Sequence, residues 1–152
     1  HAGEQILLAR TGAGRWERRT PPCPRALVAA IETQDGLVAA CRPPGANGPT
    51  ELQTSSDGGR TWAVVWQQSF PSPLASLAVT TDAAVVGLEN GDVLRSADNG
   101  MHFSAVLETD GSPGIRFTDA QHGFVTTGPA SGRRLFDTRD GGATWRPLRL
   151  PG

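Results

Sequence analysis

The sequence predicts an all-β protein made of repeated four-stranded antiparallel sheets, about three and a half of them in 152 residues. Three observations favour this fold class. A turn motif recurs with a period of about 41 residues, apolar runs of strand length lie between its copies, and the chain holds 19 glycines and 12 prolines. Such a content of turn-forming residues is typical of short-stranded β proteins, which reverse direction often.

Composition excludes several classes of function. The 14 basic and 15 acidic residues give a formal net charge of −1, and no basic segment is interleaved with aromatic residues. We therefore expect no nucleic-acid partner. No apolar run approaches the roughly 18 residues of a membrane-spanning helix, so no membrane span is expected. All cations are arginines, and tyrosine is absent.

The recurring motif reads Ser or Thr, any residue, Asp, any residue, Gly, any residue, Thr or His, and then Trp or Phe. It occurs at Ser55–Trp62, Ser96–Phe103 and Thr138–Trp145, and each of these segments is called a box below. The aspartates are 41 and 42 residues apart. This spacing fits one propeller blade of about 40 to 45 residues. A fourth, eroded copy lies at Thr11–Trp16.

Each residue type in the box has an architectural task. The aspartate and the hydroxyl group can accept backbone N–H bonds within their own tight turn. The glycine adopts positive φ, and the aromatic ring buries a large apolar area as the chain enters the next strand. His102, at the threonine position of the second box, is interpreted as a local hydrogen-bonding substitute. The residues with these structural tasks are Ser55, Asp57, Gly59, Thr61, Trp62, Ser96, Asp98, Gly100, Phe103, Thr138, Asp140, Gly142, Thr144 and Trp145.

The boxes divide a single repeat domain, residues 1–152, into a half blade at 4–19 and three blades at 24–67, 74–107 and 114–150. The first blade is predicted to contain strands at Ala26–Glu32, Leu37–Cys41, Glu51–Thr54 and Trp62–Gln67. The second contains Leu74–Thr80, Ala83–Glu89, Asp92–Arg95 and Phe103–Leu107, and the third Ile115–Thr118, Gly123–Thr127, Arg134–Asp137 and Trp145–Arg149. Ala26–Glu32 taken alone favours a helix, but its place in the repeat indicates a strand.

Cys23 and Cys41 flank a segment whose middle carries a turn signal, Gln34–Gly36. If this segment forms a hairpin, a disulfide across its ends closes a loop worth about 3 kcal/mol in the chain-entropy model. Two buried thiols are the alternative. Oxidation would imply an exported protein, so the localisation expected is extracytoplasmic: periplasmic, cell-surface or secreted. The chain begins at His1 without a signal segment, which is expected to have been removed or omitted.

On its boxes the sequence resembles the Asp-box (bacterial neuraminidase) repeat proteins, over Gln5 to Leu150. In those proteins the box recurs at one hairpin of each β-propeller blade, where it marks the fold and confers no activity. The third repeat looks most like blades of photosystem II stability/assembly factor-like proteins, which occur widely as exported proteins. That likeness rests on Ile115, Phe117, Asp119, His122, Gly123, Phe124, Gly128 and Leu135.

The resemblance to sialidases implies a tyrosine nucleophile, and the chain contains none, so a complete sialidase is excluded. A xyloglucanase-type inverting hydrolase would need two carboxylates about 6.5 to 9.5 Å apart. Glu51, Glu108 and Asp110 are the candidates, against an interpretation as solvated loop acids. His122 beside Asp119 is interpreted as a turn cap. The three histidines lie in three separate contexts, so no metal and no cofactor is expected.

One rim of the propeller is predicted to collect arginines and two aromatic residues from the loops opposite the boxes. This face is interpreted as an anionic or carbohydrate-binding surface, because arginine makes planar bidentate contacts with carboxylates and phosphates. Solvated loop charge is the alternative, and Trp66 has the strand parity of a buried residue. The residues are Arg18, Arg19, Arg25, Arg42, Trp66, Phe70, Arg133 and Arg134.

Three and a half blades do not close a ring, since propellers have about four to eight. The chain is therefore expected to be a fragment of a longer propeller or to be completed by a homodimer. The function expected is a non-catalytic binding or scaffold module that recognises a protein or glycan partner. The alternative is a fragment of a sialidase-like or xyloglucanase-like glycoside hydrolase that lacks its full catalytic set.

Overall fold

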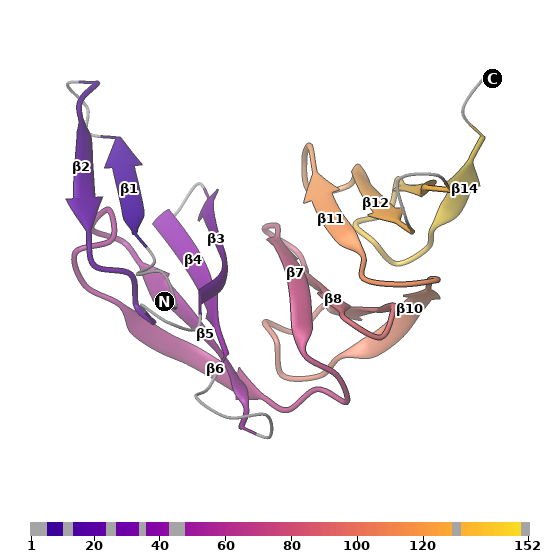
Figure 1. The fold of residues 1–152 in the computed structure, drawn as a ribbon, viewed down its shortest axis with the longest axis horizontal. Helices are drawn as coiled ribbons and strands as arrows, with labels where there is room; N and C mark the ends of the chain where they lie inside the picture. The colour runs from indigo at the N-terminus through magenta and orange to yellow at the C-terminus, as the bar shows by residue number, and fades with distance from the viewer. Residues whose placement is uncertain are drawn as a thin grey trace. The chain divides into compact units, whose positions relative to one another are not determined.

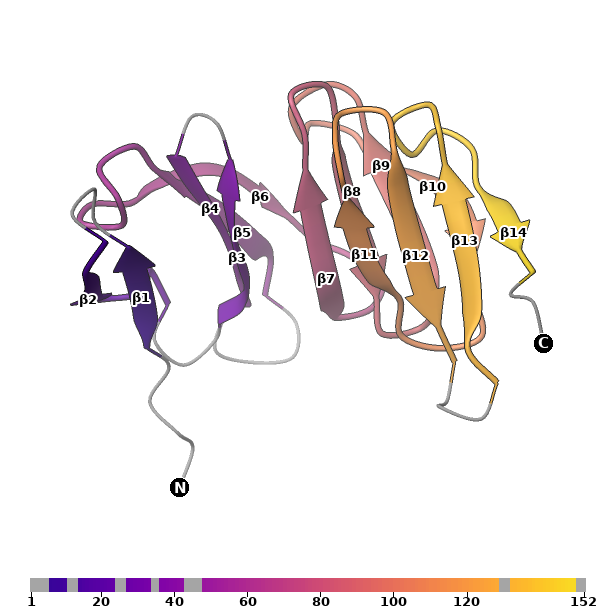
Figure 2. The same ribbon diagram turned by 90° about the horizontal axis from the view of Figure 1, so that it is seen from above.

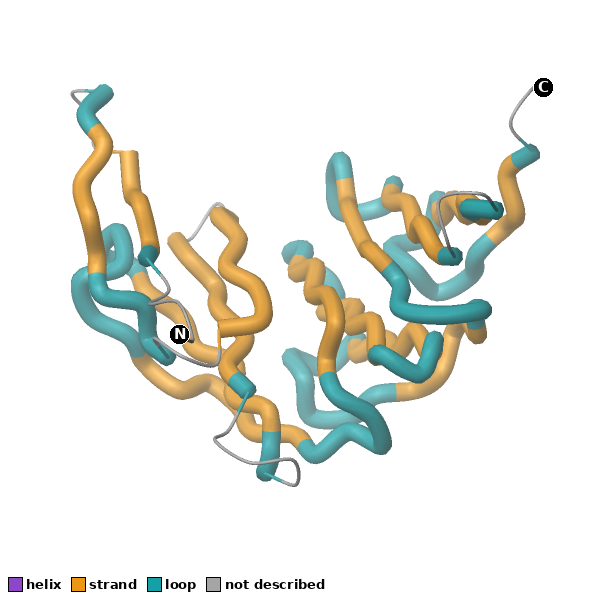
Figure 3. The backbone as a smooth tube through the Cα atoms, in the orientation of Figure 1, coloured by secondary structure: helices purple, strands orange, loops and turns teal. Residues whose placement is uncertain are grey.

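Secondary structure in the computed structural model consists of strands and turns only, over the described residues 6–10, 14–23, 27–33, 36–42, 48–128 and 132–149 (Figure 3). The all-β prediction is confirmed. The alanine-rich segment that alone favours a helix is a strand, β3 (Leu27–Thr33), because it pairs along its length with the next strand.

The chain divides into two compact units, His1–Ser69 and Phe70–Gly152. The first unit holds a two-stranded sheet, β1 and β2, and a four-stranded antiparallel sheet in the order β3-β4-β5-β6. The strands are β1 (Leu7–Arg10), β2 (Trp16–Arg19), β3, β4 (Gly36–Cys41), β5 (Thr50–Ser55) and β6 (Ala63–Gln68).

The second unit holds two four-stranded antiparallel sheets, which are called the middle blade and the last blade below. The middle blade has β7 (Leu74–Val79), β8 (Ala84–Leu88), β9 (Asp92–Ser96) and β10 (Ser104–Glu108). The last blade has β11 (Gly114–Phe117), β12 (Gly123–Thr127), β13 (Arg134–Thr138) and β14 (Arg146–Leu148). Each sheet is a meander of sequence neighbours, and Figures 1 and 2 show β11 beside β7 and β8.

The outer strands begin one residue later than predicted. Trp62, Phe103 and Trp145 were expected to open their strands, but β6, β10 and β14 start at the following residue. The aromatic residues still belong to the box turns, where their side chains are partly buried. The predicted extent of one repeat domain over 1–152 stays a prediction.

The core of the second unit lies between the middle and last blades. Ala78, Val85 and Val93 of the middle blade and Ile115 and Val125 of the last blade form one buried cluster. Phe117, Phe136 and Trp145 pack against it. Apolar burial of this kind contributes about 25 cal/mol per Å², so the contact between blades stabilises both sheets.

Close approach of backbone also joins these two blades. A Cβ atom at Gly87 would lie 2.6 Å from Pro113 Cγ, so only glycine fits there. Ser76 Oγ donates a hydrogen bond of 2.6 Å to the Pro113 carbonyl. Gly142 has φ of +82°, and a Cβ on it would lie 3.1 Å from Val85 Cγ2. The third box therefore packs its glycine turn onto the neighbouring blade.

Candidate functional site

The first box is a closed network of hydrogen bonds around Asp57. The carboxylate Oδ1 accepts from the backbone N–H groups of Arg60 and Thr61, both at 2.9 Å. Oδ2 accepts from the Thr61 hydroxyl at 2.6 Å. Ser55 Oγ donates to Oδ1 and accepts from the Gly59 N–H, both at 2.8 Å. The carboxylate is used within its own turn.

The second box repeats this network with a histidine in place of threonine. Asp98 Oδ1 accepts from the His102 N–H at 2.9 Å, and His102 Nδ1 lies 2.6 Å from Oδ2. Ser96 Oγ donates to Asp98 at 2.7 Å and accepts from the Gly100 N–H at 2.8 Å. The imidazole occupies the place of the threonine hydroxyl, which is the substitution inferred from the sequence.

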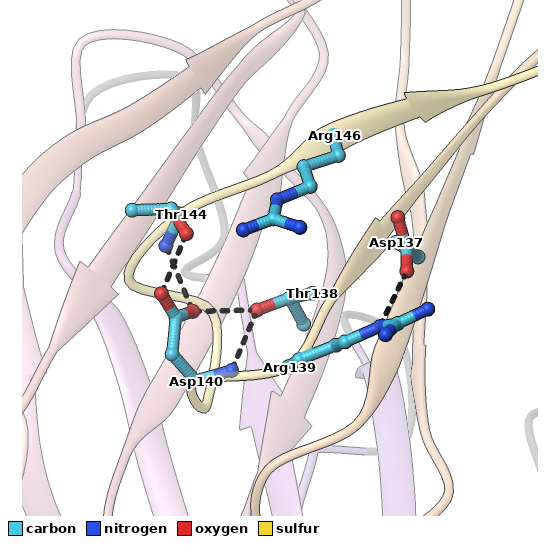
Figure 4. Close-up of a pocket in the computed structure, with 6 residues that line it drawn as sticks. All are labelled: Asp137, Thr138, Arg139, Asp140, Thr144 and Arg146. Carbon is cyan, nitrogen blue, oxygen red and sulfur yellow. Dashed lines mark hydrogen bonds and ion pairs between the residues drawn. The ribbon is translucent and has the colours of Figure 1, made fainter.

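The third box is drawn in Figure 4. Asp140 Oδ1 accepts from the Thr144 N–H at 2.9 Å and from Thr138 Oγ1 at 2.8 Å, while Oδ2 accepts from the Thr144 hydroxyl. The Gly142 N–H donates to Thr138 Oγ1 at 2.9 Å. The three aspartates therefore have matching surroundings, because the turn imposes the same donors each time.

These hydrogen bonds stabilise the ionised carboxylates. The Thr144 hydroxyl, followed by its N–H and the Thr138 hydroxyl, lowers the pKa of Asp140 to about 2. The Thr61 hydroxyl in the first box, and the His102 N–H in the second, hold the pKa values of Asp57 and Asp98 well below their ordinary range. A carboxyl group that must donate a proton in catalysis needs the opposite shift. In all three turns the carboxylate accepts hydrogen bonds from its own backbone.

The aromatic residues near the boxes make ring contacts. Phe117 meets Trp145 edge to face with ring centroids 6.1 Å apart. Phe70, a candidate for ligand stacking, meets Phe103 edge to face with centroids 5.2 Å apart. Trp66 lies on β6 and is partly buried. The contact of Phe70 gives it a packing role that the sequence did not indicate.

Cys23 and Cys41 form a disulfide, with Cα atoms 5.8 Å apart. Cys41 is buried at the end of β4, and Cys23 lies in the segment that joins β2 to β3. The bond therefore ties the connection that follows the two-stranded sheet to the end of β4, an inner strand of the four-stranded sheet.

The arginines expected on one rim lie in two units. Arg18, Arg19 and Arg42 belong to the first, and Arg133 and Arg134 to the second, while Arg25 lies outside the described residues. Arg19 pairs with Glu17, and Arg134 Nη1 lies 3.1 Å from Asp110 Oδ2. Sequence reasoning missed these acidic partners, which lie on a neighbouring strand position and on another loop.

The candidate catalytic acids have other partners. Glu51 accepts from Gln67 Nε2 at 2.7 Å and from Gln53 Nε2 at 3.2 Å. Asp110 is paired with Arg134, and Glu108 is exposed at the end of β10. Glu51 lies in the first unit, and Glu108 and Asp110 lie in the second.

Asp119 caps a turn with His122, as its sequence position indicated. Oδ1 accepts from the His122 and Gln121 N–H groups, both at 2.8 Å, and these bonds lower the pKa of Asp119. Over the described part of the chain, no group of three or more His, Cys, Asp or Glu residues could hold a metal ion. Within those same residues, no helix is long and apolar enough to span a membrane.

A pocket of about 180 Å³ lies beside the third box (Figure 4). Its lining combines residues of the box, Arg139 among them, with Asp137 of β13 and Arg146 of β14. Arg139 Nε lies 3.4 Å from Asp137 Oδ2. The lining residues are Asp137, Thr138, Arg139, Asp140, Thr144 and Arg146.

No family model matches the sequence. No curated protein matches it either. Among solved structures, 40 chains match this fold. One of them, described as "YCF48 bound to D1 peptide", superimposes with a TM-score of 0.59 at 17% identity. The match covers 93% of this chain and 45% of the other, so this chain spans less than half the length of that structure. With three meandering four-stranded sheets and this structural likeness, the chain has a β-propeller fold.

Proposed function

We propose that this chain is a non-catalytic protein-binding module of an exported Asp-box β-propeller protein. One observation carries the proposal: the likeness over 93% of the chain to a propeller whose structure was solved with a bound peptide. Propellers gather loops from successive blades on one rim, and such loops are where binding residues concentrate.

Two features of the chain support this proposal. The box aspartates accept hydrogen bonds from donors of their own turns, and these bonds lower their pKa values, which disfavours a role as general acid. The disulfide between Cys23 and Cys41 supports export, because such bonds persist in oxidising compartments.

A glycoside hydrolase is disfavoured by the contacts of the candidate acids. An inverting hydrolase needs two carboxylates that face each other across a cleft. Glu51 instead accepts hydrogen bonds from Gln53 and Gln67, and Asp110 pairs with Arg134.

The test is a selection from a library of displayed peptides, run beside a glycan array, with the oxidised chain as bait. Enrichment of peptides, and their loss in the loop variant Arg133→Glu/Arg134→Glu, is the expected result. Arg149→Glu, which changes an exposed arginine outside those loops, is the matched control and should retain binding. Glycan binding without peptide enrichment would replace the proposal with a lectin-like function, and glycoside hydrolysis would refute the non-catalytic part.

The proposal includes further blades that complete the propeller. Leu8 and Trp16 in the two-stranded sheet are 57% and 66% exposed, whereas the box tryptophans of the four-stranded sheets are partly buried. The greater length of the structural neighbour supports the same idea. The further blades belong either to a longer polypeptide or to a second copy of this chain. Light scattering distinguishes these two cases: a particle of 16.0 kDa indicates the longer polypeptide, and a dimer indicates the second copy.

A further inference from the structure

Each four-stranded sheet is entered through a connector, which is the segment that joins it to the sheet before it. The connectors follow β2, β6 and β10. The second strands of the three sheets end at Cys41, Leu88 and Thr127, and these side chains are all buried. The three positions are equivalent, because each comes four residues after the partner of the first box residue, which is Leu37, Ala84 or Gly123.

In the middle and last blades, hydrogen bonds tie the connector to this strand end. The Glu89 N–H, directly after Leu88, donates to the Pro73 carbonyl at 2.8 Å. The Thr127 hydroxyl donates to the Gly111 carbonyl at 3.1 Å. Neither bond depends on an oxidant or a reductant.

In the first unit the equivalent tie is the disulfide between Cys23 of the connector and Cys41 of β4. The chain has two cysteines, and both belong to this bond. The second unit therefore contains no thiol and no disulfide. Of the three ties compared, the one in the first unit is the one that a reductant can open.

The strand next to this tie is weakly held at the same end. β3 lies at the edge of its sheet, so β4 is its one neighbour within that sheet. The register of the β3–β4 ladder shifts between Leu27 and Ala29, and Leu27 is the residue that pairs with Cys41. An irregularity of this kind interrupts the ladder locally. The first residue of β3 thus depends on the disulfide more than the residues beyond the shift do.

We propose that the Cys23–Cys41 disulfide is a redox-controlled tie for the entry to the first four-stranded sheet. Reduction frees the connector and the start of β3 from the end of β4, and leaves the second unit unchanged. The Cys41 thiol stays in its buried position, where a free cysteine behaves as a small apolar residue. The ladder between β4 and β5 is therefore retained.

The tie opens by thiol–disulfide exchange with a dithiol reductant. Cys23 is half-buried and Cys41 is 3% exposed, so a thiolate of the reductant attacks Cys23 Sγ. The bond to Cys41 breaks, and the Cys41 thiolate takes up a proton. The second thiol of the reductant then displaces Cys23, which is protonated in turn. Two electrons pass to the chain, and the reductant becomes a disulfide.

The experiment measures amide hydrogen exchange of the full chain by mass spectrometry, before and after reduction with dithiothreitol. Exchange at the start of β3 and in the connector should accelerate at least tenfold, because loss of the crosslink lowers the cost of local opening. Exchange in β8 and β12 should change less than twofold, and reoxidation should restore the first pattern. No ligand is involved, so the result is independent of the proposed binding function.

Two variants separate loss of the tie from other effects of the reductant. Cys23→Ser keeps Cys41 in place, so this variant should match the reduced chain, and dithiothreitol should change its exchange less than twofold. Ser72→Ala is the matched control, because it removes a 3.1 Å hydrogen bond from the Asn90 N–H in the equivalent connector of the middle blade. Its response to dithiothreitol should equal that of the unmodified chain.

Two results would overturn the inference. One is exchange at β3 that reduction and Cys23→Ser leave unchanged. The other is exchange that accelerates equally in both units, which would mean that reduction unfolds the whole chain.

Discussion

The middle and last blades have the same architecture and opposite surroundings at equivalent positions. Val85 on β8 and Phe124 on β12 occupy the same place in the sheet, next to the strand that leads into the box. Val85 is fully buried, and Phe124 is 37% exposed. Strand pairing within a blade therefore does not decide whether a side chain on its face is buried. Burial requires a neighbouring sheet that covers that face.

The largest effect is expected from a charge placed at these two positions. Val85→Asp buries a carboxylate against Gly142 and the apolar cluster, which should cost about 3 kcal/mol or more of unfolding free energy. Phe124→Asp stays hydrated and should cost less than about 1 kcal/mol. Urea denaturation of both variants measures the contrast, and equal losses would refute the assignment of the two faces.

A smaller effect is expected where the blades approach most closely. Gly87→Ala pushes a methyl group against Pro113 and Ser76 and should cost about 2 kcal/mol by overpacking. The equivalent position in the last blade is Thr126, and Thr126→Gly should cost only about 0.5 to 1 kcal/mol of unfolding free energy through backbone entropy. Thermal unfolding checks the order, which would be wrong if Thr126→Gly were the more harmful change.

The hydrogen bond between blades gives the third contrast. Arg95→Met keeps much of the apolar stem but loses the donor to the Gly141 carbonyl. We expect the free energy of unfolding to fall by about 1 kcal/mol. Asp137→Ala on the last blade removes a 3.4 Å ion pair whose arginine is exposed, and should cost about 0.5 kcal/mol or less of unfolding free energy. Hydrogen exchange of the third box should accelerate in Arg95→Met alone. Acceleration in both would show that the two contacts have the same weight.

Acid titration gives the smallest effect and tests whether the two blades share their turn chemistry. The pKa of Asp140 falls from 3.8 to about 2 on folding, so its contribution is present above about pH 4 and is lost as the pH falls toward 2. Screening keeps it to about 1 kcal/mol or less. The lowered pKa of Asp98 predicts the same sign for the middle blade. Asp140→Asn should flatten the loss of stability between pH 4 and 2, and an unchanged slope would contradict this account.

Much of the fold could be predicted because the box is a local structure. Asp57, Asp98 and Asp140 recur at the blade period, and their donors lie within four residues along the chain. Strand ends were less predictable. Trp62 is a residue type that favours strands, but it belongs to the turn and β6 starts after it. The hydrogen bonds of the box extend to Thr61, the residue before it.

The candidate sites were less predictable, because they depend on contacts between distant segments. Phe70 gave no signal of its contact with Phe103. Asp110 comes from a loop separate from that of Arg134, so the sequence does not pair the two. Glu17 lies two residues before Arg19 on β2, where strand alternation places both side chains on one face and could have indicated the pair. The positions of Arg116 and Asp137 on either side of Phe124 become visible only when the strand register is known.

The sequence by itself determined the repeated unit, its four strands and the box turn that joins the third strand to the fourth. These features depend on hydrogen bonds between residues close along the chain. Only the tertiary structure decided which faces are covered and which are open. Val85 and Phe124 are both apolar residues on equivalent strands, and their burial depends on whether another sheet packs against them. Which face is covered depends on contacts between blades. There the buried apolar area and the close approach of backbones determine the free energy of packing.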